Sequence, residues 1–165
     1  MIAIRRLLYP DLEVERLIDI PMTLLKEKNI QGLIFDLDNT IIGWDSNEMQ
    51  QEIISWLSNL KDKGFKIYIV SNSMKKRVKN IAESLSIPYI ARAGKPMNYG
   101  FLKALKNLNL DSKSVAVVGD QIFTDVLGGN RIGAFTILVK PLSKKEFFTT
   151  QLTRKFERLL LDRKI

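Results

Sequence analysis

Short apolar segments alternate along this chain with longer amphipathic segments, and this alternation constrains the fold more than any other feature. Segments that alternate in this way are typical of α/β proteins with a mainly parallel sheet. The sequence therefore predicts a doubly wound, Rossmann-like sheet of five strands with helices on both faces. The apolar runs that we predict as strands are Gly32–Asp36, Lys66–Val70, Pro88–Ala91, Ser114–Val118 and Phe135–Val139.

The segments between these runs have the periodicity of helices. Asn47–Lys63 carries apolar residues at helical spacing, with Ser46 or Asn47 as the expected N-cap and Gly64 as the expected stop. The other predicted helices are Lys75–Leu85, Asn98–Leu108 and Thr124–Arg131.

The chain has 165 residues and contains neither cysteine nor histidine. This composition excludes disulfides, Cys/His zinc sites, thiolate nucleophiles and Ser-His-Asp triads. Catalysis must then depend on carboxylates, hydroxyls, lysines and a magnesium-type ion, an inventory that suits phosphate chemistry. We expect one domain over residues 1–165, with a core at about 32–140, an N-terminal extension over 1–31 and a basic C-terminal helix over 141–165.

Two carboxylates, Asp36 and Asp38, directly follow the apolar run that precedes them. In open α/β sheets, ligands bind at the carboxyl ends of the strands. Two acids at that edge can divide the chemistry, because one can attack as a nucleophile while the other transfers a proton.

Three further groups of polar residues follow predicted strands: Ser71-Asn72-Ser73, Gly94-Lys95-Pro96 and the pair Asp120 and Asp125. Each has a simpler reading when taken alone, since Ser71 and Asn72 are plausible helix caps and Lys95 a surface lysine. Taken together they favour a functional site, because doubly wound topology brings all of these strand ends to one crevice.

In this order the motifs resemble those of the haloacid dehalogenase (HAD) superfamily of aspartate-nucleophile phosphatases. The resemblance implies that Asp36 is the nucleophile and Asp38 the general acid/base. It also implies a Mg²⁺ cofactor held by Asp36, Asp38 (through its backbone carbonyl) and Asp120, with Asp125 supporting the metal and the lysine. The residues that we expect to contact the substrate are Asn39, Thr40, Ser71, Asn72 and Lys95.

The spacing of the motifs leaves no room for a cap domain, so we expect the capless subclass III, with only a short flap over Ile41–Ser46. A capless site suits a phosphate carried on a large molecule. The run Gly119–Arg131, together with Gly94-Lys95-Pro96, resembles the YqeG-type branch, which is related to mitochondrial phosphatidylglycerophosphate phosphatases. This likeness implies a lipid substrate that is dephosphorylated to phosphatidylglycerol.

Two alternatives stay open at this point. The first is a soluble phosphatase acting on nucleotides, sugar phosphates or phosphoproteins, which would use the same site residues. The second is a non-catalytic module of this fold that binds a partner through its basic surface. No nucleic-acid motif is present, so we expect no nucleic-acid partner. The sequence does not indicate an oligomeric state.

The net charge of +8 is concentrated near the C-terminus, where residues 140–165 carry eight basic and three acidic side chains. The apolar spacing there fits an amphipathic helix on an anionic membrane surface, and it equally fits a helix packed on the sheet. No apolar run approaches the ~18 residues of a membrane-spanning helix. We therefore expect a cytoplasmic protein, with peripheral contact to the inner face of the membrane as one outcome.

Overall fold

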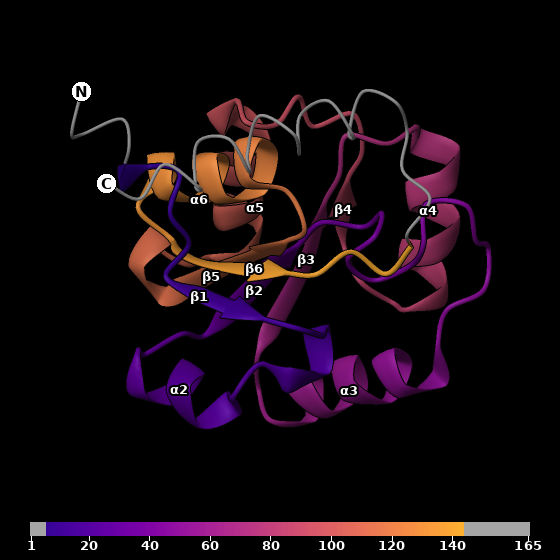
Figure 1. The fold of residues 1–165 in the computed structure, drawn as a ribbon, viewed down its shortest axis with the longest axis horizontal. Helices are drawn as coiled ribbons and strands as arrows, with labels where there is room; N and C mark the ends of the chain where they lie inside the picture. The colour runs from indigo at the N-terminus through magenta and orange to yellow at the C-terminus, as the bar shows by residue number, and fades with distance from the viewer. Residues whose placement is uncertain (1–5, 144–165) are drawn as a thin grey trace, which may run out of the picture.

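The computed structural model describes residues 6–143, and its centre is a parallel sheet of six strands in the order β1-β6-β5-β2-β3-β4 (Figure 1). From β2 the chain continues to β3 and β4 on one side and then crosses back to β5 and β6 on the other. The order therefore reverses beside β2, which makes the carboxyl end of β2 a topological switch point. The strands are β1 (Leu12–Val14), β2 (Gly32–Phe35), β3 (Lys66–Val70), β4 (Tyr89–Ile90), β5 (Val115–Gly119) and β6 (Phe135–Val139).

The five predicted strands are all present, but the prediction of five strands is wrong by one. The additional strand, β1, lies in the predicted N-terminal extension and pairs in parallel with β6, with Leu12 opposite Ile137 and Val14 opposite Val139. Its position is fixed by Asp11, whose side chain accepts hydrogen bonds from the backbone N–H (2.8 Å) and the hydroxyl (3.1 Å) of Thr136. Three residues are too few to show a periodic pattern in the sequence. This segment is a strand because it pairs with β6, which lies far away in the chain.

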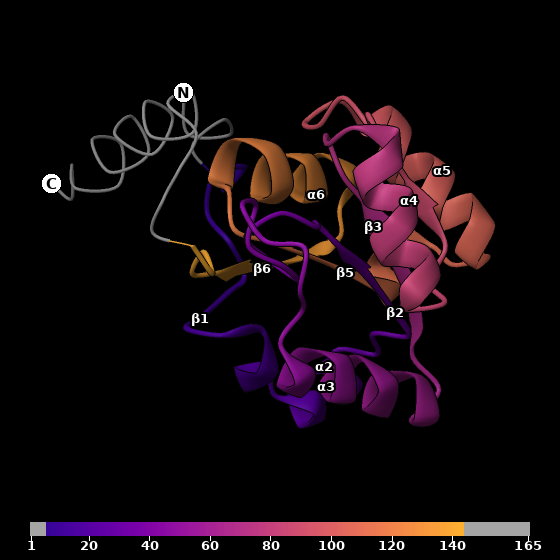
Figure 2. The same cartoon turned by 90° about the vertical axis from the view of Figure 1, so that its right-hand side faces the viewer.

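Helices cover both faces of the sheet. Figure 2 shows α2 and α3 on one side and α5 and α6 on the other. The side chains of β2 divide accordingly: Leu33 and Phe35 pack into the core beneath α2, α3 and α4, whereas Ile34 packs beneath α5. The helices are α2 (Met22–Glu27), α3 (Gln51–Asp62), α4 (Lys75–Ser84), α5 (Asn98–Leu108) and α6 (Leu127–Ile132), with short 3₁₀ turns at Leu17–Asp19 and Ser112–Ser114.

Helix α3 begins later than the sequence predicts. Its N-cap is Gln50, not Ser46 or Asn47. The Ser46 hydroxyl instead accepts a hydrogen bond from the Glu48 backbone N–H at 3.0 Å and donates to the Glu48 carbonyl at 2.9 Å, so it closes a local turn. The predicted stop is confirmed, because Gly64 follows the helix with a φ of +86°.

The predicted helix over Thr124–Arg131 is divided into two parts. A π-helical turn spans Ile122–Val126 and continues directly into α6. Asp125, within this turn, is buried, and its carboxylate lies against Gly119 at the end of β5.

Candidate active site

A cavity of about 480 Å³ opens where β2, β3 and β5 end. The structure brings six of the predicted site residues to its wall, from the loops after β2, after β3 and before α5. Thr40, Asp120 and Asp125 are buried and do not line the cavity. The lining residues are Asp36, Asp38, Asn39, Trp44, Ser71, Asn72, Ser73, Met74, Arg77, Lys95, Gln121 and Thr124.

The floor of this cavity is a buried ion cluster centred on Lys95. The Lys95 Nζ donates to Asp36 Oδ1 at 2.7 Å and to Asp125 Oδ1 at 2.6 Å. All three side chains are almost completely shielded from solvent. A buried charge is tolerated only when it is paired, so these three residues depend on one another.

The cluster perturbs the ionisation of two of its members. Burial of the Asp36 carboxylate raises its pKa to about 7, although the nearby Lys95 ammonium opposes the shift. Burial also disfavours the Lys95 ammonium, but the carboxylates of Asp125 and Asp36 outweigh that effect and raise the pKa of Lys95 above its usual value. Lys95 is therefore a permanent cation, while Asp36 can gain or lose a proton near neutral pH.

Asp36, Asp120 and Asp125 could together hold a metal ion. Each offers one carboxylate oxygen, these oxygens lie within 4.8 Å of one another, and all three residues are buried. Hard oxygen ligands at this spacing suit Mg²⁺. Gly119 permits the arrangement, because a Cβ at that position would lie 2.1 Å from Asp125 Oδ2.

Asp36 and Asp120 of the predicted ligand set belong to this grouping, and so does Asp125, for which we predict a supporting role. The predicted contact of Asp38 with the metal is through its backbone carbonyl. The side chain of Asp38, by contrast, is directed to other partners.

Asn72 positions Lys95 through the backbone. Its side-chain amide donates to the Lys95 carbonyl at 3.1 Å, and its Oδ1 accepts from the Lys95 N–H at 2.7 Å. The alternative role of Ser71 and Asn72 as helix caps is wrong, because Met74 is the N-cap of α4 and no side chain caps that end. The Ser71 hydroxyl accepts a hydrogen bond from the Ser73 N–H at 3.1 Å.

Asp38 is held by Arg77 and Ser73, neither of which is among the predicted substrate-binding or catalytic residues. Arg77 Nε donates to Asp38 Oδ1 at 2.8 Å, and the Ser73 hydroxyl donates to Asp38 Oδ2. Arg77 belongs to the run Lys75-Lys76-Arg77, which reads in the sequence as a solvated helix surface. Only the fold reveals that the third member of that run turns toward the cavity.

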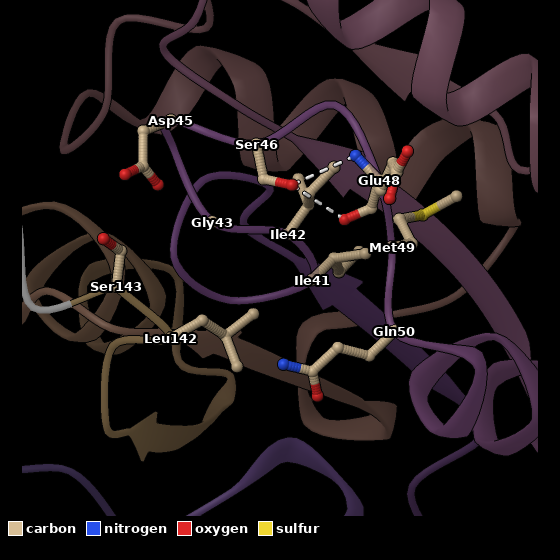
Figure 3. A pocket seen from close by; sticks show the side chains of 10 residues that line it. All are labelled: Ile41, Ile42, Gly43, Asp45, Ser46, Glu48, Met49, Gln50, Leu142 and Ser143. Atoms are coloured by element: carbon tan, nitrogen blue, oxygen red, sulfur yellow. Dashed lines mark hydrogen bonds between the residues drawn. The ribbon is translucent and has the colours of Figure 1, made fainter.

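Asn39 supports the flap as well as lining the cavity. It has a φ of +61°, its N–H donates to the Ile42 carbonyl at 2.6 Å, and its Oδ1 accepts from the Trp44 N–H at 3.3 Å. The flap is bordered by a second cavity of about 640 Å³, seen from close by in Figure 3. That cavity is lined by Ile41, Ile42, Gly43, Asp45, Ser46, Glu48, Met49, Gln50, Leu142 and Ser143.

One predicted feature lies almost entirely outside the described residues. The basic C-terminal helix falls almost wholly on residues 144–165, and the first five residues are likewise not described. Within residues 6–143, no helix combines the length and the apolar character needed to cross a bilayer.

Solved structures with this fold include several phosphatases. The cobalt-bound form of deoxy-D-mannose-octulosonate 8-phosphate phosphatase from Haemophilus influenzae has a TM-score of 0.57 at 13% identity, over 83% of this chain and 90% of its own. An uncharacterized protein from Listeria monocytogenes serotype 4b has a TM-score of 0.55 at 20% identity, over 82% of this chain and 100% of its own. At these identities the likeness concerns the fold alone.

Several relatives found by sequence comparison are named as phosphatases. Probable phosphatase YqeG of Bacillus subtilis (strain 168) is 42% identical over 158 residues, which are 96% of this chain and 92% of the relative. Phosphatidylglycerophosphate phosphatase 1, chloroplastic/mitochondrial, of Arabidopsis thaliana is 28% identical over 96% of this chain and 49% of its own length. The family model described as mitochondrial PGP phosphatase matches residues 1–141.

Fold, site and relatives agree on the class, which is that of capless HAD-superfamily phosphatases, enzymes that hydrolyse phosphoric monoesters. Within that class, this chain belongs to the mitochondrial PGP phosphatase family. The interpretation as a non-catalytic module is thereby set aside.

Proposed function

We propose that the protein dephosphorylates phosphatidylglycerophosphate to phosphatidylglycerol, through an aspartyl-phosphate intermediate and with Mg²⁺ as cofactor. The proposed reaction mechanism is supported above all by the buried cluster in which Lys95 bridges Asp36 and Asp125 at the switch point of the sheet. The proposed lipid substrate is supported by the names of the family and of the plant relative.

In the proposed reaction, Asp36 attacks the phosphorus atom and the ester oxygen of the lipid leaves. Asp38 gives a proton to that oxygen and later takes one from the water that opens the aspartyl phosphate. Lys95 offsets charge on the transferring oxygens, while Ser71 and Asn72 border the same wall of the cavity. Bound at Asp36, Asp120 and Asp125, Mg²⁺ would screen the repulsion between the carboxylates and the phosphate.

The open cavity supports a substrate whose phosphate is attached to a bulky group. Within residues 6–143, no inserted domain covers the carboxyl edge of the sheet, and the flap contributes Trp44 to the cavity wall. A phosphate at the surface of a bilayer could therefore reach Asp36 without leaving the membrane. We accordingly propose a peripheral position on the cytoplasmic face of an anionic membrane.

The test is a substrate comparison with the purified full chain and Mg²⁺. Phosphatidylglycerophosphate in mixed micelles is compared with glycerol 3-phosphate, a nucleoside monophosphate, a sugar phosphate and a phosphoserine peptide. We expect the highest kcat/KM for the lipid. Equal or higher kcat/KM for a soluble phosphate would support the alternative of a soluble phosphatase, and the Asp36→Asn variant measures the background in every assay.

A further inference from the structure

Arg77, in the first turn of α4, connects the Asp38 carboxylate to the flap. All three guanidinium nitrogens donate hydrogen bonds. Nε donates to Asp38 Oδ1 at 2.8 Å, Nη1 to the Ser46 carbonyl at 2.9 Å and Nη2 to the Gly43 carbonyl at 2.9 Å. A longer contact of 3.5 Å joins Nη1 to Asn47 Oδ1. One side chain therefore joins a carboxylate in the wall of the catalytic cavity to two carbonyls of the flap.

This contact differs from an ordinary surface ion pair. The Arg77 and Asp38 side chains are only 23% and 22% exposed, and both line the catalytic cavity. The planar fork of arginine matches several acceptors at once, and an ammonium group cannot reproduce that geometry. Arg77 is thus well suited to hold a carboxylate in one orientation.

The orientation of Asp38 matters because a proton is transferred efficiently only over hydrogen-bond distance. A general acid that can rotate away spends much of its time outside that range, and the reaction slows accordingly. Arg77 and Ser73 each hold one oxygen of Asp38, so its carboxyl group has a single arrangement in the wall of the cavity.

We propose that Arg77 is a positioning residue, which holds both the Asp38 carboxyl group and the flap in the arrangement needed for proton transfer to the leaving group. The proposal rests on the general acid/base role given to Asp38 under the proposed function. It assigns Arg77 no contact with the reacting atoms.

The test uses the dependence of kcat/KM on the leaving group, because kcat/KM covers the step in which the ester oxygen departs. A p-nitrophenolate leaving group needs little protonation, whereas the alkoxide from glycerol 3-phosphate or the lipid needs a proton. For Arg77→Gln we expect a loss on the order of 10–100-fold with the alkyl phosphate and only a few-fold with p-nitrophenyl phosphate. Arg77→Lys should fall between Arg77→Gln and wild type.

The matched control is Lys75→Gln, which removes a neighbouring exposed cation and should leave the rates with glycerol 3-phosphate and p-nitrophenyl phosphate unchanged. Equal losses with both substrates, or no loss, would overturn the positioning role. Asp38→Asn separates this outcome from failure of the proposed mechanism. If that variant loses kcat/KM equally with the alkyl phosphate and with p-nitrophenyl phosphate, Asp38 is not the general acid. Circular dichroism and thermal melting verify that each variant is folded.

A second feature is independent of Arg77 and concerns the outer surface around the cavity mouth. Apart from Arg77 and Lys95 of the catalytic cavity, residues 71–110 carry six exposed basic side chains and one acidic side chain, Glu83. In the described part of the chain, four of the five exposed large apolar side chains also lie in this stretch, each more than half exposed. They are Met74, Met97, Tyr99 and Leu102.

Met74 lines the catalytic cavity, and the other three side chains belong to the start of α5. Met74 and Met97 are the N-caps of α4 and α5, which begin at the same edge of the sheet. Their two loops lie side by side, since the Arg92 N–H donates to the Ser73 carbonyl at 3.1 Å. Lys103 Nζ lies 5.9 Å from the centroid of the Tyr99 ring, which places positive charge beside the apolar side chains.

We infer that this rim, formed by the starts of α4 and α5, docks on an anionic lipid bilayer. Positive charge alone would also suit a nucleic acid. Exposed methionine, tyrosine and leucine side chains favour a lipid surface, because they can insert between headgroups while the lysines meet anionic phosphates. The inference extends the proposed lipid function and identifies the surface that would present Asp36 to its substrate.

The experiment is cosedimentation of the full chain with phosphatidylglycerol/phosphatidylcholine vesicles at low salt. For Lys76→Glu/Lys103→Glu we expect at least about tenfold weaker binding. The control Lys26→Glu/Lys28→Glu makes the same charge change on and just after α2. It should bind the vesicles much more tightly than Lys76→Glu/Lys103→Glu does. A second variant, Met97→Ser/Tyr99→Ser, should weaken binding while leaving p-nitrophenyl phosphate turnover unchanged.

Equal weakening by both charge variants would overturn the inference, because binding would then depend on total charge and not on this rim. Unchanged binding of the serine variant, or tighter binding to an oligonucleotide than to vesicles, would do the same. Vesicle binding is measured without turnover, so its outcome is separate from that of the substrate comparison.

Discussion

Asp36 and Asp38 are separated by a single residue, yet their carboxylates occupy different surroundings. Asp36 lies at the buried floor of the cavity and is paired with a lysine from the loop before α5. Asp38 is partly exposed and is held by a serine from the loop before α4 and an arginine from the first turn of that helix. The comparison shows how one short motif supplies two different groups, because each acid meets a different neighbouring segment.

The largest effect that we expect from this comparison concerns Asp36. Replacing it with asparagine should abolish turnover, with a loss of at least ~10⁴-fold in kcat, because an amide cannot form the aspartyl phosphate. Circular dichroism should show an intact fold. Near-native phosphatase rates in this variant would contradict the assignment of the nucleophile.

The next effect concerns the cation that joins the buried carboxylates. Lys95→Met leaves the carboxylates of Asp36 and Asp125 buried without a counter-charge, and we expect it to lower the free energy of unfolding by about 3–5 kcal/mol. Chemical denaturation at pH 8, with and without chelator, measures the loss. Arg77→Met serves for comparison and should cost less, because Asp38 remains partly exposed to water. Similar losses for the two variants would mean that burial does not distinguish the two clusters.

A smaller effect is expected from the metal. If Asp36, Asp120 and Asp125 bind Mg²⁺, saturation at about 100 times the dissociation constant should stabilise the protein by ~2.7 kcal/mol. Excess chelator should remove this stabilisation and stop turnover. Asp120→Asn should melt at nearly the same temperature with and without Mg²⁺, whereas Asp38→Asn should keep most of the shift. Full activity in excess chelator would exclude the metal from the mechanism.

The smallest effect that we expect is a dependence of stability on pH. Because burial raises the pKa of Asp36 to about 7, from 3.8 in the unfolded chain, the folded state binds more protons between those values. Stability of the metal-free protein should therefore fall as the pH rises through this range, on the order of 2 kcal/mol between pH 5 and 7.5. Asp36→Asn should flatten this slope. Denaturation curves in chelator at several pH values measure both, and an unchanged slope in the variant would assign the effect to another group.

The sequence was most informative where a side chain lies at the end of a strand. Five strands, the helix Asn98–Leu108 and the stop at Gly64 were predicted from apolar periodicity and glycine position, which are local properties. The convergence of Asp36, Ser71 and Lys95 on one cavity also followed, since parallel strands place their carboxyl ends along one edge.

Other features depended on contacts between segments far apart in the chain. The strand Leu12–Val14 exists because β6 offers an unpaired edge, and three residues carry no periodic signal of their own. The later start of α3 depends on the turn that Ser46 closes with Glu48, a choice between two local structures of similar energy.

By itself, then, the amino-acid sequence determined the order of the elements and which chemical groups stand at the strand ends. Tertiary structure alone decided partners such as Arg77 for Asp38 and Asn72 for the Lys95 backbone. The physical reason is that a charged side chain has the same local conformational preferences whether it lies on the surface or in a buried cluster. Its surroundings, set by residues 20 to 60 positions away, decide whether it is a solvated surface charge or part of a buried cluster.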